Sequence, residues 1–200
     1  MSEVNRQILL VARPEGDIKD SDFKYQEGPV PSISDGQFLV RNLYLSLDPA
    51  MRGWMRDAES YVEPIQLGDV MRGFAVGEVV ESKANGIEKG DKVTGLGGWQ
   101  DYVVYGPGNM GNKLPAEVPM PLTNFLSILG ITGLTAYFGF LDICEPKEGE
   151  TLVVSTAAGA VGSIVCQLGK IKGCRVVGIA GTDDKCNWAK NEIGADAGII

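Results

Sequence analysis

Histidine does not occur anywhere in the 200 residues of this chain. Its absence excludes three kinds of site within these residues: general acid–base catalysis by an imidazole, a serine–histidine triad, and zinc held by histidine. Any chemistry carried out by these residues must therefore proceed without an imidazole.

Cysteine is scarce, and its spacing excludes a further class of site. The four cysteines, Cys144, Cys166, Cys174 and Cys186, form no Cys-x-x-Cys pair. Such pairs are typical of zinc ribbons and of redox motifs, so we expect no metal site. We interpret the cysteines as reduced residues of a cytoplasmic protein, and Cys166, in an apolar helical stretch, as a small core residue.

Long apolar runs and an excess of positive charge are also missing. Residues 118–141 carry no charge, but Pro119, Pro121 and three glycines interrupt them. We predict two buried helices meeting at a glycine kink there, rather than a membrane span. The formal net charge of −8 argues against a nucleic-acid partner. Neither a membrane nor a nucleic acid is therefore an expected partner.

The most informative stretch is rich in small residues. An apolar, β-branched run at residues 151–154 predicts a buried strand, and small residues at 157–162 predict a tight turn. Apolar residues at helical spacing predict a helix over 161–172, and residues 175–180 predict a second strand. Strand, glycine turn, helix and strand within roughly 30 residues are the context of a dinucleotide-binding fingerprint.

The chemistry of this turn favours phosphate binding over a purely structural connection, which is the alternative. Small residues let the backbone approach a pyrophosphate, and unpaired N–H groups at the start of a helix attract an anion. Gly162 is predicted to remove a Cβ where the helix packs on the strand. Ala157 takes the place of the first glycine of the usual Gly-x-Gly-x-x-Gly pattern.

The residues before about position 115 predict a β-rich domain. Six runs bounded by turn residues are predicted strands: 6–13, 23–27, 37–47, 71–82, 91–96 and 99–105. Several short strands with regular turns are typical of a small barrel. Asp48 is predicted to cap a short helix, with Pro49 at its first position. Three aromatic residues are predicted to lie in the barrel core or at its rim: Trp99, Tyr102 and Tyr105.

A proline-rich connector at residues 115–121 predicts a boundary between two domains. We place the first domain at residues 1–120 and the second at 121–200. The second alternates helices with strands, which indicates a doubly wound parallel sheet. Residues 197–200 begin a third strand, whereas such sheets usually have about six. We therefore expect this chain to be the N-terminal part of a longer protein, with both domains incomplete and the parallel sheet truncated.

Taken together, the motifs resemble one family. The segments NLYLSLDPAMRGWM (42–55) and GITGLTAYFGFLDIC (130–144), followed by the glycine-rich stretch, are similar in order and spacing to the medium-chain dehydrogenase/reductase superfamily. Within it, the chain resembles the zinc-free prostaglandin and leukotriene reductases and the NADPH-dependent curcumin and enone reductases. The resemblance implies a GroES-like β-barrel catalytic domain followed by a Rossmann domain, and a homodimer. It also implies a metal-free enzyme in which NADPH delivers hydride to the β-carbon of an α,β-unsaturated ketone or aldehyde.

The resemblance further assigns residues to the cofactor. Those at the pyrophosphate are Ala158, Gly159, Ala160, Val161 and Gly162. Ile131 and Thr135 are assigned to the neighbourhood of the nicotinamide carboxamide. For Thr135 the alternative is an ordinary threonine that caps a helix or lies in the core.

The end of the second strand favours NADP over NAD. NAD enzymes place an acidic residue there to hold the ribose hydroxyls, whereas this strand leads into Gly181 and Thr182. Asp183 and Asp184 are predicted to cap and begin the next helix. By the resemblance, Lys185 contacts the adenosine 2′-phosphate, and the alternative is a solvated lysine on the helix surface.

By the same resemblance, the substrate cleft is bordered by Met51, Arg52 and Trp54. Ala50 stands where many relatives carry tyrosine, so the substrate preference does not transfer directly. For Arg52 an ion pair between domains is the alternative role. Two other functions stay open: a quinone reductase of the same superfamily, and an NADPH-binding protein without catalysis.

Overall fold

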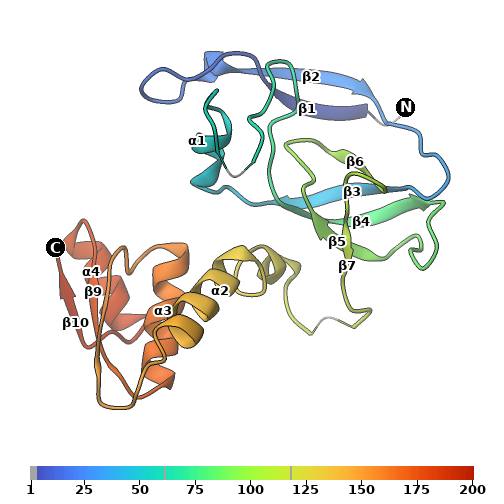
Figure 1. Ribbon diagram of the computed structural model, residues 1–200. Helices are drawn as coiled ribbons and strands as arrows, with labels where there is room; N and C mark the ends of the chain where they lie inside the picture. The colour runs from blue at the N-terminus through green and yellow to red at the C-terminus, as the bar shows by residue number, and fades with distance from the viewer. Residues whose placement is uncertain (1–3, 61, 118) are drawn as a thin grey trace. The chain divides into compact units, whose positions relative to one another are not determined.

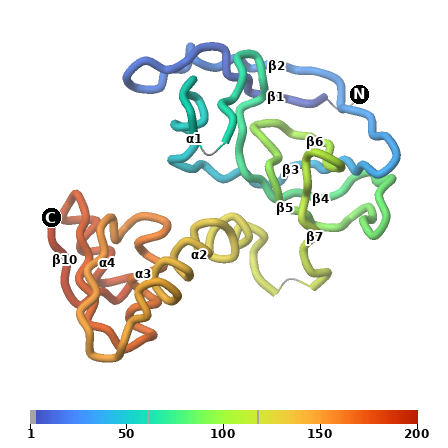
Figure 2. Tube along the Cα trace, in the orientation of Figure 1, coloured from blue at the N-terminus to red at the C-terminus, as the bar shows by residue number. Residues whose placement is uncertain are grey.

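The structure, a computed structural model, describes residues 4–60, 62–117 and 119–200. The chain forms two compact units, Met1–Leu126 and Ser127–Ile200, which can be followed along the chain in Figures 1 and 2. The division falls after the 3₁₀-helix η2 (Leu122–Leu126), whereas the sequence predicts it between residues 120 and 121. The difference arises because η2 packs against strand β4 (Ala75–Ser82) of the first unit.

The first unit consists mainly of antiparallel strands. Strands β1 (Val4–Leu10) and β2 (Phe23–Pro29) form a two-stranded ribbon. A second sheet has the order β6-β3-β4-β5-β7 (Figure 1). Its other strands are β3 (Phe38–Leu45), β5 (Lys92–Gly95), β6 (Tyr102–Tyr105) and β7 (Asn112–Lys113). Single bridges from Gln7 to Gln100 and from Leu9 to Val70 join the ribbon to segments beside the sheet.

The short helix α1 (Ala50–Trp54) forms where the sequence predicts it, but its cap differs. Pro49 is the N-cap, and no side chain caps the helix. Asp48 contributes its carbonyl oxygen, which accepts the N–H of Met51 at 3.0 Å. The prediction that Asp48 caps the helix through its side chain is wrong, because the helix begins one residue later than the Asp-Pro pattern implies.

Aromatic residues contribute to the interior of the first unit. Tyr105 is 1 % exposed, its ring lies 5.6 Å from that of Phe38, and burial raises the pKa of its phenol. Tyr102 is also buried, and Trp99 stacks on Phe23 with 5.7 Å between ring centroids. The prediction that Trp99, Tyr102 and Tyr105 belong to the core or its rim is confirmed.

The second unit alternates helices and parallel strands. Its sheet has the order β10-β9-β8, with β8 at Thr151–Val154, β9 at Arg175–Ile179 and β10 at Ala197–Ile199. Helix α3 (Ala160–Ile171) connects β8 to β9, and helix α4 (Asp183–Asn191) connects β9 to β10. Cys166 lies fully buried in the core between sheet and helices, as predicted. The predicted fold class, a β-domain followed by a doubly wound parallel sheet, is confirmed.

The carboxylate of Asp196 ties the amino end of this sheet together. It accepts hydrogen bonds from the Lys170 ammonium at 2.8 Å and from the backbone N–H of Val176 at 2.6 Å. The hydrogen bond from Lys170 holds the pKa of the Asp196 carboxyl below its usual range. Helix α3, strand β9 and the residue before β10 are therefore fixed to one another at this end.

The uncharged stretch departs from the predicted pair of buried helices. η2 is a short 3₁₀-helix, α2 (Ile131–Ala136) is also short, and the chain continues as the π-helix η3 (Tyr137–Ile143). Four side chains of α2 and η3 are each 53 % exposed: Ile131, Leu134, Tyr137 and Phe138. The prediction of buried helices is therefore wrong for this structure, and Val118 lies outside the described residues. No helix within the described ranges is long and apolar enough to cross a bilayer.

Glu145, which follows η3 and its C-cap Cys144, has a left-handed backbone with φ 46°. Because glycine adopts this conformation without strain, we predict that Glu145→Gly raises the free energy of unfolding by about 0.5–1 kcal/mol. Denaturant unfolding of the two proteins measures the change. Gly149→Ala, at φ 84°, is the matched control and should destabilise. A less stable Glu145→Gly variant would contradict the interpretation of this residue as strained.

Candidate functional site

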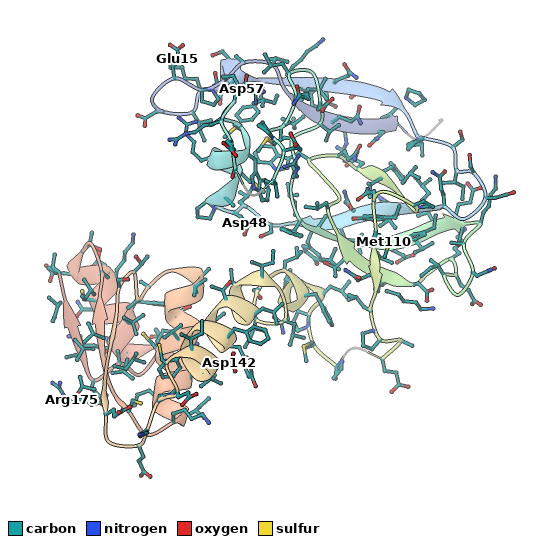
Figure 3. All side chains as sticks on the ribbon, in the orientation of Figure 1. Glu15, Asp48, Asp57, Met110, Asp142 and Arg175 are labelled. Atoms are coloured by element: carbon teal, nitrogen blue, oxygen red, sulfur yellow. The ribbon has the colours of Figure 1, made fainter. Side chains whose placement is uncertain are left out.

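The turn between β8 and α3 lies at the carboxyl edge of the parallel sheet. The N–H of Ala157 donates to the carbonyl of Ile179 at 2.9 Å, which ties the turn to the end of β9. The N–H of Ala180 donates in turn to the carbonyl of Ile199, at the end of β10. Arg175, labelled in Figure 3, marks the opposite, amino end of β9. Ligands of doubly wound proteins bind outside the carboxyl edge.

Backbone donors are left unpaired where α3 begins. Its N-cap is Gly159, which has no side chain to accept a hydrogen bond. Ser163 N–H donates to Gly159 O at 2.9 Å. The N–H groups of Ala160, Val161 and Gly162 have no hydrogen-bond partner among the described residues. Three N–H groups at the positive end of a helix form an environment that favours an anion such as a pyrophosphate.

The glycines of the fingerprint play different parts from those predicted. A Cβ on Gly162 would lie 2.2 Å from the carbonyl oxygen of Thr156, inside the turn itself. The contact with the strand is made instead by Gly169, where a Cβ would lie 2.5 Å from Cδ2 of Leu152. The predicted reason for Gly162 is therefore wrong, because the turn comes closer to the helix than the strand does. The sequence did contain a signal for the role of Gly169: this glycine follows Gly162 by seven residues in the same helix, which puts both on one helix face.

Ala157, which takes the place of the first glycine of the Gly-x-Gly-x-x-Gly pattern, is accommodated by a glycine on the neighbouring strand. The residue is fully buried. It faces Gly178 of β9, since a Cβ on Gly178 would lie 2.8 Å from the Cβ of Ala157. A glycine on the neighbouring strand thus makes room for the methyl group that the turn carries.

The end of β9 brings the second group of predicted residues to the same edge. Thr182 is the N-cap of α4, and its Oγ1 accepts the N–H of Lys185 at 3.3 Å. Asp183 and Asp184 lie in the first turn, so the cap itself is Thr182 and not an aspartate as predicted. Gly181 and Lys185 are exposed, which leaves a cation on the surface of the first turn of α4.

Ile131 and Thr135 lie on α2, which packs against α3 in the same unit. Both side chains are exposed. The hydroxyl of Thr135 donates to the carbonyl of Ile131 at 2.7 Å, a bond within the helix. Thr135 therefore is neither a cap nor a core residue.

The three candidates for the substrate side lie in the first unit. Met51 and Trp54 are buried in its core. The Arg72 guanidinium lies 5.6 Å from the Trp54 ring centroid. Arg52 donates through Nη2 to the carbonyls of Pro14 and Gly16, at 3.3 and 2.7 Å. Arg52 thus binds a loop of its own unit. Met51, Arg52 and Trp54 all belong to helix α1, and Figure 3 labels Asp48 just before this helix begins.

Comparison with known proteins places this geometry in a family. Residues 6–113 match the family described as the N-terminal domain of oxidoreductase. NADPH-dependent curcumin reductase of Escherichia coli (strain K12) is 47 % identical over 194 residues, which cover 96 % of this chain and 55 % of that protein. The NADP(+)-dependent 2-alkenal reductase of Nicotiana tabacum is 40 % identical over 196 residues, covering 96 % of this chain and 57 % of that protein.

Solved structures show the same relationship. CurA from Vibrio vulnificus, crystallised in complex with NADPH, superimposes with a TM-score of 0.90 at 45 % identity. The match covers 97 % of this chain and 57 % of that one. The chain thus spans just over half the length of these relatives.

The fold and the glycine turn define a dinucleotide-type parallel sheet that follows an antiparallel β-domain. The chain belongs to this oxidoreductase family, and within it to the zinc-free medium-chain reductases that its motifs resemble.

The tight turn makes a testable prediction about stability. Replacing Gly162 with alanine would push a Cβ into the Thr156 carbonyl, which is backbone and cannot swing away. We expect Gly162→Ala to lower the free energy of unfolding by about 2–3 kcal/mol. Gly181→Ala is the matched control, because no atom lies within 4 Å of its added Cβ, and it should change stability by less than about 0.5 kcal/mol. Equal stabilities of the two variants would contradict the close packing of the turn.

Proposed function

We propose that the protein carrying this chain is an NADPH-dependent oxidoreductase that reduces the C=C bond of α,β-unsaturated ketones and aldehydes by hydride transfer. The observation that carries the proposal is the row of unpaired N–H groups at Ala160, Val161 and Gly162, on the sheet edge that also carries Lys185. The relatives named for NADPH-dependent curcumin reduction and 2-alkenal reduction support the reaction class.

The residues of the second unit fit a nicotinamide dinucleotide. In the proposal, the turn from Ala158 through Gly162 receives the pyrophosphate on its unpaired N–H groups. Gly181 leaves open space beside the adenosine ribose, Thr182 fixes the start of α4, and Lys185 supplies a positive charge for the 2′-phosphate. When bound, NADPH supplies the hydride, and this chain's residues hold and orient it.

Ile131 and Thr135 are proposed for the nicotinamide end of the site. Thr135 already satisfies its hydroxyl proton on the Ile131 carbonyl, so its oxygen is left as a hydrogen-bond acceptor. The carboxamide of nicotinamide carries N–H donors that suit such an acceptor. The exposed apolar side chain of Ile131 supplies a neighbouring surface for the ring.

Met51, Arg52 and Trp54 are proposed to shape the substrate side from within the first unit. Two of them are buried, and the third holds the loop at residues 14–16. Their contribution is therefore to fix α1 and this loop, on which a substrate-binding surface depends. The structure offers no side chain of this set as an acid or base, and the proposal names no catalytic residue.

We further propose that the first unit is the catalytic domain and the second the NADP-binding domain. The complete protein is proposed to act in the cytoplasm as a homodimer on small molecules. All four cysteines are free thiols, three of them buried, which suits a reducing compartment. Burial raises the pKa of the Cys166 thiol, which keeps this residue protonated and unreactive.

Selectivity for NADPH is tested by replacing Lys185. We expect Lys185→Ala to weaken NADPH binding roughly 10- to 100-fold through the loss of a charged contact, with NADH binding unchanged. Calorimetric titration of the complete protein with each cofactor measures both constants. Lys190→Ala, in the last turn of the same helix, is the control and should leave both unchanged. Equal weakening of NADPH and NADH would show that Lys185 does not select the 2′-phosphate.

The reaction class is tested by the loss of NADPH absorbance with an enone, an enal or a quinone as acceptor. We expect the complete protein to accelerate NADPH oxidation with the enone and the enal, and mass spectrometry to detect the saturated carbonyl product. Acceleration by the quinone alone would indicate a quinone reductase. NADPH binding without turnover of any acceptor would indicate a binding protein without catalysis.

A further inference from the structure

Thr156 has an unusual backbone for its residue type. It follows β8 by two residues, and its φ is 51°. A β-branched side chain rarely occupies this left-handed region, because its branches crowd the backbone. Glycine would adopt the same conformation without strain. The surrounding structure must therefore hold Thr156 in this strained conformation, and residues with strained backbones concentrate at functional sites.

The left-handed turn places the Thr156 carbonyl against the first turn of α3. Its oxygen accepts the N–H of Gly159 at 2.8 Å and lies 2.2 Å from the position that a Cβ of Gly162 would occupy. This partial negative charge thus lies close to Gly159 and Gly162 at the start of α3. The N–H groups of Ala160 and Val161, which have no partner among the described residues, are left to interact with an anion.

The side chain of Thr156 restricts the turn from a second direction. Its Cγ2 methyl lies 2.9 Å from the position that a Cβ on Gly159 would occupy. Thr156 therefore contacts both fingerprint glycines, one through its methyl group and both through its carbonyl. The glycines need to be glycines largely because Thr156 occupies the space beside them.

We infer that Thr156 is a positioning residue of the pyrophosphate site. Its strained backbone turns the carbonyl away from the anion, and its branched side chain holds Gly159 so that the N–H groups of α3 are preorganised. This inference rests on the proposed NADPH function. In this inference Thr156 does not contact the cofactor. It positions the backbone N–H groups of α3 that make the contact.

Two variants test the inference in the complete protein. Thr156→Gly removes the strain and the methyl group, whereas Thr156→Val keeps the branched shape and replaces the hydroxyl with a methyl group. We expect Thr156→Gly to unfold at the same or a higher temperature than the original protein, yet to bind NADPH roughly tenfold more weakly, because preorganisation is lost. Thr156→Val should bind NADPH within about threefold of the original protein, because the methyl contact persists.

Weaker NADPH binding by Thr156→Gly at an unchanged or higher melting temperature is the result that supports the inference. Unchanged NADPH affinity in this variant overturns it, and so does a parallel fall in melting temperature and affinity, which indicates a purely structural residue. A Thr156→Val protein that binds as weakly as Thr156→Gly also overturns it, because the hydroxyl then contacts the cofactor. Failure of the original protein to bind NADPH would instead overturn the proposed function itself.

Discussion

The close approach of the Thr156 carbonyl to the first turn of α3 is the constraint on which the second unit depends. It explains why neither Gly162 nor Gly159 has a side chain. The three N–H groups beside it are unpaired because they begin a helix. The hydrogen bond from Ala157 to Ile179 then aligns this turn with the end of β9. The conformation of Thr156 therefore sets the shape of the sheet edge, and the start of α3 sets its polarity.

The first unit uses a different device to fix its short helix. Two arginine side chains donate hydrogen bonds to backbone carbonyls, not to carboxylates. Arg52 donates to Pro14 and Gly16. Arg13 donates to Met55 and Ile65. The loop and the helix thus hold each other through reciprocal bonds. Because these acceptors are neutral carbonyls, the arrangement does not depend on the ionisation of an acid.

The sequence predicted much of this architecture because periodicity and turn chemistry agree locally. Strand 151–154 and the third strand were placed within a residue, since β-branched runs bounded by turns have few alternatives. The predictions from the sequence failed where contacts between distant segments determine the local structure. The role of Gly162 and the conformation of Thr156 depend on an approach between turn and helix that composition does not encode. The apolar pattern of α2 and η3 predicts that these helices are buried, yet several of their apolar side chains are exposed. Such a pattern does not identify which surface would cover them.

The most direct test of the account follows backbone amide signals of the complete protein by nuclear magnetic resonance during titration with NADPH and with NADH. The account predicts that the amides of Ala160, Val161 and Gly162 shift with both cofactors, since both carry a pyrophosphate. Residues around Lys185 should respond more strongly to NADPH, which alone carries the 2′-phosphate. Saturating NADPH that leaves the amides of Ala160, Val161 and Gly162 unshifted would contradict the account.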